Sequence, residues 1–107
     1  MDRTTLAQAL ETGRITGEVA TPRENNLEHI RRFLAGERQF DFGVSLTRDW
    51  DFDSVFALMV DRAGLRPDPA FTHGVDTIST EKCIDALDSL AAVIGDVARA
   101  GGRILFA

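Results

Sequence analysis

The chain has 107 residues, of which 44% are hydrophobic, and this length fits one domain with a modest core. Its formal net charge of −5 argues against a nucleic-acid partner, because binding to a phosphate backbone relies on clustered Lys and Arg. No stretch reaches membrane-spanning length, and the single cysteine, Cys83, excludes a disulfide scaffold, so we expect a cytoplasmic protein without membrane contact.

The first half of the chain predicts two helices and an extended segment. A short helix occupies about residues 5–12 and ends at the glycine that follows. A second helix starts at Thr21-Pro22-Arg23-Glu24, where a capping threonine precedes a proline at the first helical position. It runs to about Ala35, before Gly36. Residues 40–46 alternate apolar with polar or small side chains, which favours a short strand or extended segment.

The second half predicts two more helices around an irregular segment. A third helix, capped by Asp51 or Asp53, reaches about Ala63. Residues 70–78 have no clear period, and a fourth helix then occupies about residues 80–100 behind a capping serine. Polar residues are confined to one stripe of this last helix, which is typical of a helix that lies on a sheet.

The end of the chain predicts a buried strand. Arg103-Ile104-Leu105-Phe106-Ala107 follows a double glycine and has the pattern of a central parallel strand. One strand cannot form a sheet, so its backbone groups need partner strands from a second chain or from a C-terminal portion. We therefore expect an α/β fold in which residues 1–107 are a single domain or the α-rich N-terminal part of one, with about four helices.

The start of the second predicted helix is a candidate anion site. Arg23 shares a face with the apolar stripe of that helix, and Asn26 lies in the adjoining row. Both stand beside backbone N–H groups that a helix leaves unpaired, which suits a phosphate or a carboxylate. The plainer interpretation is that Thr21 and Glu24 only cap the helix while Arg23 and Asn25 are solvated, and the residues alone favour it.

Two sharper interpretations of Asp49-Trp50-Asp51-Phe52-Asp53 fail on spacing. A calcium loop starting at Asp49 needs a glycine where Ser54 stands and a glutamate where Val60 stands. An aspartyl-phosphate nucleophile of the haloacid-dehalogenase type would follow a buried strand, whereas the residues before Asp51 are polar. Helix capping by the aspartates is the better explanation.

His73 and Asp76 lie in the irregular segment, where functional groups are often displayed. A histidine near a carboxylate can do acid–base work or bind a metal, although the pair does not define a metal site. Alternatively, Asp76 and Thr77 shape the turn into the last helix. Cys83 lies in a helical pattern and is expected to be a core residue, not a nucleophile.

Three stretches together resemble a known family: Val19-Ala20-Thr21-Pro22-Arg23-Glu24-Asn25-Asn26-Leu27, Asp76-Thr77-Ile78 and Gly102-Arg103-Ile104-Leu105-Phe106-Ala107. They resemble the N-terminal part of a family of predicted bacterial phosphatases, mostly from actinobacteria. The resemblance covers nearly the whole chain, and the first stretch is its most specific part. It implies that members continue with a Thr-Gly-His-Pro turn, absent here, that contributes to the site.

The residues and the resemblance together predict hydrolysis of a phosphoric ester of a small phosphorylated metabolite. The expected substrate-binding residues are Thr21, Arg23, Asn25 and Asn26, and the expected catalytic residues are His73 and Asp76. Arg23 would hold phosphate oxygens, and the two asparagines would orient them. No nucleophile, metal or cofactor is assigned, and the chain by itself is expected to be inactive.

Two alternatives concern the chain end. In the first, the chain is a non-catalytic module that binds a ligand or a protein. It oligomerises through residues 103–107, either as a homo-oligomer or with a second polypeptide. A break after Ala107 would instead leave a following chain that begins with threonine, a terminus able to act as a nucleophile. Proteolysis of an exposed loop is the simpler origin of such a break.

Overall fold

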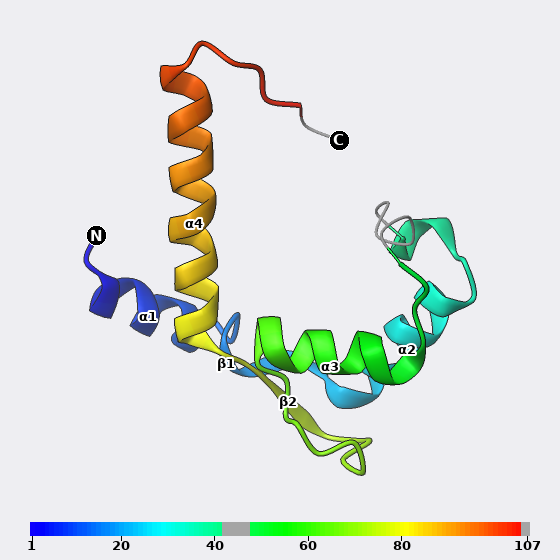
Figure 1. Ribbon diagram of the computed structural model, residues 1–107. Coiled ribbons are helices and arrows are strands. Elements are labelled where there is room, and N and C mark those ends of the chain that lie inside the picture. The colour runs from blue at the N-terminus through cyan, green and yellow to red at the C-terminus, as the bar shows by residue number, and fades with distance from the viewer. Residues whose placement is uncertain (42–47, 106–107) are drawn as a thin grey trace.

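The computed structural model describes residues 1–41 and 48–105. These residues form four α-helices, a short 3₁₀ helix and a two-stranded sheet, which confirms the α/β class (Figure 1). In chain order the elements are α1 (Arg3–Thr12), β1 (Gly17–Pro22), α2 (Arg23–Leu34), η1 (Arg38–Phe40), α3 (Phe52–Ala63), β2 (Val75–Ile78) and α4 (Thr80–Arg99). Figure 1 shows α2 and α3 toward one end of the β-ribbon, and α1 and the start of α4 at the other.

The β-ribbon corrects the sequence analysis, which left residues 70–78 irregular and did not predict β1. The strands pair antiparallel, with Gly17 opposite Ile78 and Pro22 opposite Val75, and the register is irregular between these pairs. Strand preference depends on cross-strand packing more than on local sequence, so two short segments this far apart in the chain give little local signal. Of the predicted extended segment, Phe40 ends η1 instead, and residues 42–46 lie outside the described part.

Capping signals placed two helix starts correctly. Asp51 caps α3 in a capping box with Ser54, and the Ser79 side chain accepts from the Lys82 N–H at the start of α4. Helix α1 begins earlier than predicted because Asp2 caps it through the Thr5 N–H, 2.7 Å away. These starts depend on contacts within one turn, which is why sequence spacing indicates them well.

The predicted cap of α2 is wrong. Thr21 is an exposed residue of β1, and Pro22 occupies the N-cap position without a side-chain cap. Gly74, which precedes β2, takes over this role: its carbonyl accepts from the Arg23 N–H at 2.8 Å, and its N–H donates to the Glu24 carboxylate at 3.0 Å. The helix start is thus satisfied by a distant segment, because β1 runs directly into α2.

The core of the described chain lies mainly between α2 and α3. Leu27 and Ile30 of α2 are buried against Phe56 of α3, and half-buried side chains of α3 pack around them. Val19 and Leu65 are buried as well. This small core fixes α2 against α3 and holds the first turn of α2 beside β2.

Gly64 ends α3 and packs against Ser79 at the start of α4, and we expect Gly64→Ala to cost about 2–4 kcal/mol of unfolding free energy. Its φ is 80°, and a Cβ there would lie 2.6 Å from the Ser79 Cβ and 2.9 Å from the Ser79 nitrogen. The matched control is Gly36, which has the same φ and nothing within 4 Å, so Gly36→Ala should cost only about 1 kcal/mol. Urea unfolding checks both values. Equal losses of unfolding free energy in the two variants would show that the close contact between Gly64 and Ser79 does not matter.

Helix α4 extends away from the rest of the chain (Figure 1). Among its residues, all of them described, Ile84 alone is buried, so the expectation that its apolar face lies on a sheet is not met within residues 1–41 and 48–105. Residues 103–105 are in neither helix nor strand, and residues 106–107 lie outside the described part. A terminal strand needs partner strands from elsewhere and stays a prediction.

Across the described residues, no helix combines the length and the apolar character needed to cross a membrane.

Candidate functional site

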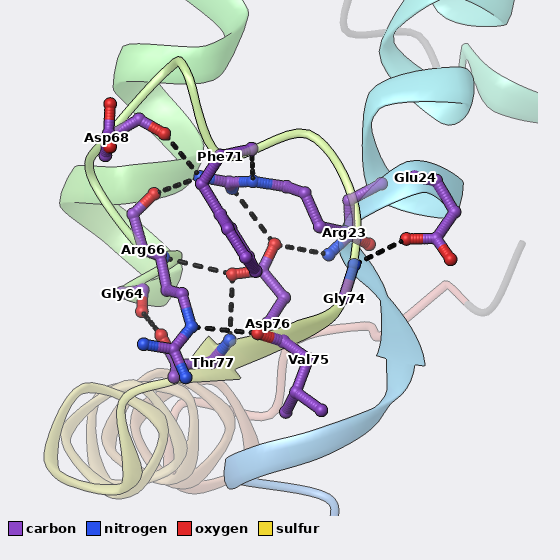
Figure 2. A network of polar contacts seen from close by, with 11 residues as sticks. Arg23, Glu24, Gly64, Arg66, Asp68, Phe71, Gly74, Val75, Asp76 and Thr77 are labelled. Carbon is purple, nitrogen blue, oxygen red and sulfur yellow. Dashed lines mark hydrogen bonds and ion pairs between the residues drawn. The ribbon is translucent and has the colours of Figure 1, made fainter.

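The Arg23 side chain lies under the loop formed by residues 66–71 and is completely buried (Figure 2). Its Nε donates to the Phe71 carbonyl at 2.8 Å, and its Nη2 donates to the carbonyls of Asp68, at 3.1 Å, and Arg66. The guanidinium carbon is also 4.9 Å from the centre of the Phe56 ring. With the bond to Asp76 described next, these contacts engage all but one of the donors of a guanidinium.

The Asp76 carboxylate, also completely buried, is the counter-ion of Arg23. Its Oδ2 accepts from Arg23 Nη1 and from Asn26 Nδ2, each at 3.0 Å. Its Oδ1 accepts from the backbone N–H groups of Arg66, at 3.0 Å, and Thr77, at 2.8 Å. We call Arg23, Asn26, Arg66, Asp76 and Thr77 the buried network. It ties α2, the 66–71 loop and β2 together.

The network keeps Asp76 ionised. Burial by itself raises the pKa of the Asp76 carboxyl, but the hydrogen bonds from Asn26, Arg66 and Thr77 and the charge of Arg23 outweigh it, so the pKa lies below its ordinary value of 3.8. A carboxylate with four donors and a lowered pKa is a poor proton acceptor at neutral pH. The fixed hydrogen bonds of Asp76 suit a role in positioning the segments that it joins.

This lowered pKa predicts a specific loss of stability in acid. Because the Asp76 pKa is below the unfolded value of 3.8, its contribution is complete above that value and is lost as the pH falls through the folded-state pKa. We expect the unfolding free energy to fall as the pH drops below about 4. Asp2, Glu24 and Asp51 also have lowered pKa values. Urea unfolding of wild type and of Asp76→Asn at several pH values therefore isolates Asp76, because the other carboxyl groups are common to both proteins. If the unfolding free energies of the two proteins change in parallel with pH, Asp76 does not have a lowered pKa.

Arg66 and Phe71 also contribute to this site, and neither was predicted as a site residue from the sequence. Arg66 donates from Nε to the Val75 carbonyl at 2.8 Å, and its guanidinium carbon lies 5.4 Å from the centre of the Phe71 ring. The centre of the same ring is 5.4 Å from the Arg23 guanidinium carbon, so Phe71 is near two guanidinium groups. The sequence signalled only a proline-containing loop here, since backbone carbonyls that accept from an arginine leave no residue pattern.

Three of the predicted site residues are exposed. Thr21 is in β1, Asn25 is in the first turn of α2, and His73 precedes the Gly74 that is bonded to that turn. The His73 Nδ1 is 2.9 Å from the Thr72 hydroxyl. The pKa of Glu24 is lowered first by the Gly74 N–H and also by His73. We call Thr21, Asn25 and His73 the exposed edge.

The structure therefore separates the six predicted residues into two groups. Arg23, Asn26 and Asp76 meet in the buried network, whereas the Thr21, Asn25 and His73 of the exposed edge share only their exposure and their positions next to the start of α2 or to Gly74. The alternative of a solvated Arg23 is wrong, because its side chain has no exposed surface. Phosphate binding by Arg23 stays a prediction, and in this arrangement its donors point at carbonyl oxygens and Asp76.

Metal binding has no candidate among the described residues, in which no three His, Cys, Asp or Glu side chains gather closely enough to hold an ion. Cys83 is half-buried in the first turn of α4.

Comparisons with known proteins agree on one family. A family model described as Phosphatase matches residues 1–107. Over 106 residues the chain is 44% identical to a Streptomyces coelicolor protein named Phosphatase SCO2771, and the match covers 98% of this chain and 40% of that protein. The chain thus spans well under half the length of this curated relative. No solved structure matches the chain.

Proposed function

Since the chain belongs to the Phosphatase family, we propose that it is the part of a phosphatase that positions a small phosphorylated substrate. The family match over the whole chain is the observation that carries the proposal. In the reaction, water forms a new bond to phosphorus, the ester P–O bond breaks, and the departing alcohol takes up a proton. The products are inorganic phosphate and the alcohol.

The proposal assigns substrate contact to the exposed edge. Asn25 and Thr21 hydrogen-bond phosphate oxygens beside the first turn of α2, whose N-cap residue offers no side-chain acceptor. His73 transfers the proton to the leaving alcohol, since histidine is the side chain that most often acts as a general acid in enzymes. The buried network holds α2 and the segment before β2 in place. Direct phosphate contact by Arg23 requires that loop 66–71 release its carbonyls.

A chimera provides the activity test. In it, this chain replaces the matched stretch of the Streptomyces relative, so that the remaining part of that protein is present. We expect the chimera to hydrolyse p-nitrophenyl phosphate and expect His73→Ala to lower kcat/KM by about 100-fold or more, because general acid catalysis is lost. The control is His29→Ala, which changes an exposed histidine of α2 outside the edge. An equal loss in both variants would overturn the role of His73.

The isolated chain of 107 residues is expected to show no turnover of the same ester. The supporting observation is that the buried network already engages Arg23 and Asp76, which leaves few groups for the chemistry. Turnover by the isolated chain that disappears in Arg23→Lys, with the helical content intact, would contradict both this prediction and the positioning role of Arg23. Steady-state assays at high protein concentration make the comparison.

A second candidate function is a non-catalytic module that oligomerises through residues 103–107. The exposure of Ile104 and of Leu105, which is 91% exposed, supports it. A homo-oligomer in sedimentation that dissociates in Leu105→Pro would favour this function.

The proposal also includes a cytoplasmic location, for which the support is the single cysteine of the sequence.

A further inference from the structure

The exposed part of α4 carries an apolar face without cover in the described chain. Four large side chains of this face are 42–60% exposed, and we call them the docking face: Leu87, Leu90, Val93 and Ile94. At about 100° per residue, the four lie within about 120° of the helix circumference, and the buried Ile84 lies beside Leu87 at one edge of this face. Single exposed apolar residues are ordinary, but four on one helix face mark an interaction surface.

The opposite half of α4 already has its partners. Arg3 of α1 forms ion pairs with Asp85, at 2.7 Å, and with Asp88, at 3.4 Å. Nearer the end of the helix, Asp96 pairs with Arg99. Helix α4 therefore meets α1 partly through its polar half, while its apolar half is left open. This is the reverse of the usual arrangement, in which the apolar stripe faces the body of the domain.

We propose that the docking face is covered by the part of the phosphatase that lies outside the matched stretch, as it occurs in the Streptomyces relative. The match accounts for only 40% of that protein, so most of its chain is available to supply a covering surface. Ile104 and Leu105, which come after α4 in the chain, are exposed apolar residues as well. The expected cover is an apolar layer of helix or sheet. The inference rests on the family match and not on the proposed hydrolysis.

Thiol labelling of the chimera tests the inference without an activity readout. Leu90→Cys places a probe on the docking face, and Ala92→Cys places a matched probe on the polar half, where Ala92 is exposed. In the isolated chain both probes are expected to react at similar rates. In the chimera, Leu90→Cys is expected to react at least about tenfold more slowly, because a packed interface must open first, while Ala92→Cys keeps its rate. Peptide mapping separates each probe from Cys83.

A charge on the docking face gives the second measurement. Leu90→Asp is expected to lower the unfolding midpoint of the chimera and to leave the isolated chain nearly unchanged, since Leu90 is 55% exposed there. Ala92→Asp, with the same charge on the polar half, should lower the midpoint of the chimera and of the isolated chain by the same small amount, because it stands four residues from Asp88 and from Asp96. The proposal is overturned if Leu90→Cys labels in the chimera as fast as in the isolated chain. It is also overturned if the isolated chain dimerises and protects Leu90→Cys, because the occupant is then a second copy.

Discussion

Replacing Asp76 with asparagine is expected to lower the unfolding free energy by about 3–5 kcal/mol, the typical cost of breaking a buried ion pair from one side. The variant leaves the Arg23 guanidinium buried without its counter-ion, and both side chains are completely inaccessible to solvent. It also turns part of an acceptor into an NH₂ group that faces N–H donors of Asn26, Arg66 or Thr77. Since small domains are stable by about 5–15 kcal/mol, this loss brings the chain close to unfolding.

Urea unfolding monitored by circular dichroism measures the loss. The matched control is Asp61→Asn, because Asp61 pairs with Arg62 but its side chain is 73% exposed. An exposed pair contributes about 0–1 kcal/mol, so the control should stay near wild type. If Asp76→Asn is as mild as the control, the buried network is not what holds α2, β2 and the loop together.

Replacing Arg23 with lysine is expected to cost about 3–5 kcal/mol although it keeps the charge. An ammonium group is a compact donor and cannot reach Asp76 and the carbonyls of Phe71 and Asp68 at the same time. Buried carbonyls that lose their donor are left without a hydrogen bond, and their desolvation then destabilises the folded state. The lysine also loses the flat contact with the Phe56 and Phe71 rings.

The same unfolding assay tests this prediction, with Arg62→Lys at an exposed position as the control. A double-mutant cycle adds specificity. Arg23→Met combined with Asp76→Leu leaves neither charge alone in the interior, so its cost should be clearly smaller than the sum of the two single variants. Additive costs would mean that the two side chains act independently, contrary to the 3.0 Å contact between them.

These two predictions affect how the proposed activity is tested. A loss of activity in an Arg23 or Asp76 variant does not separate a substrate contact from a collapsed site, because both residues support the fold. His73 and Asn25 are exposed, so variants there can change substrate handling with little change in stability. They are the better probes of the exposed edge.

The sequence by itself determined the features that depend on near neighbours. Asp51 and Ser79 cap their helices through groups three residues away, and Gly64 ends α3 in the left-handed conformation. The helical pattern of α4 was also evident, since it rests on a period of 3.6 residues. Family membership was indicated by short stretches of sequence and confirmed by the family model over residues 1–107.

Only the tertiary structure decided which distant groups meet. Arg23 and Asp76 are 53 positions apart, and β1 pairs with β2 over a similar separation, so no local period predicts either contact. The same long-range contacts make Gly74, and not Thr21, the partner of the first turn of α2. They also bury Arg23, for which the residues alone favoured solvation. Burial of a charge depends on whether a counter-ion and carbonyl oxygens converge on it in space, and sequence spacing does not carry that information.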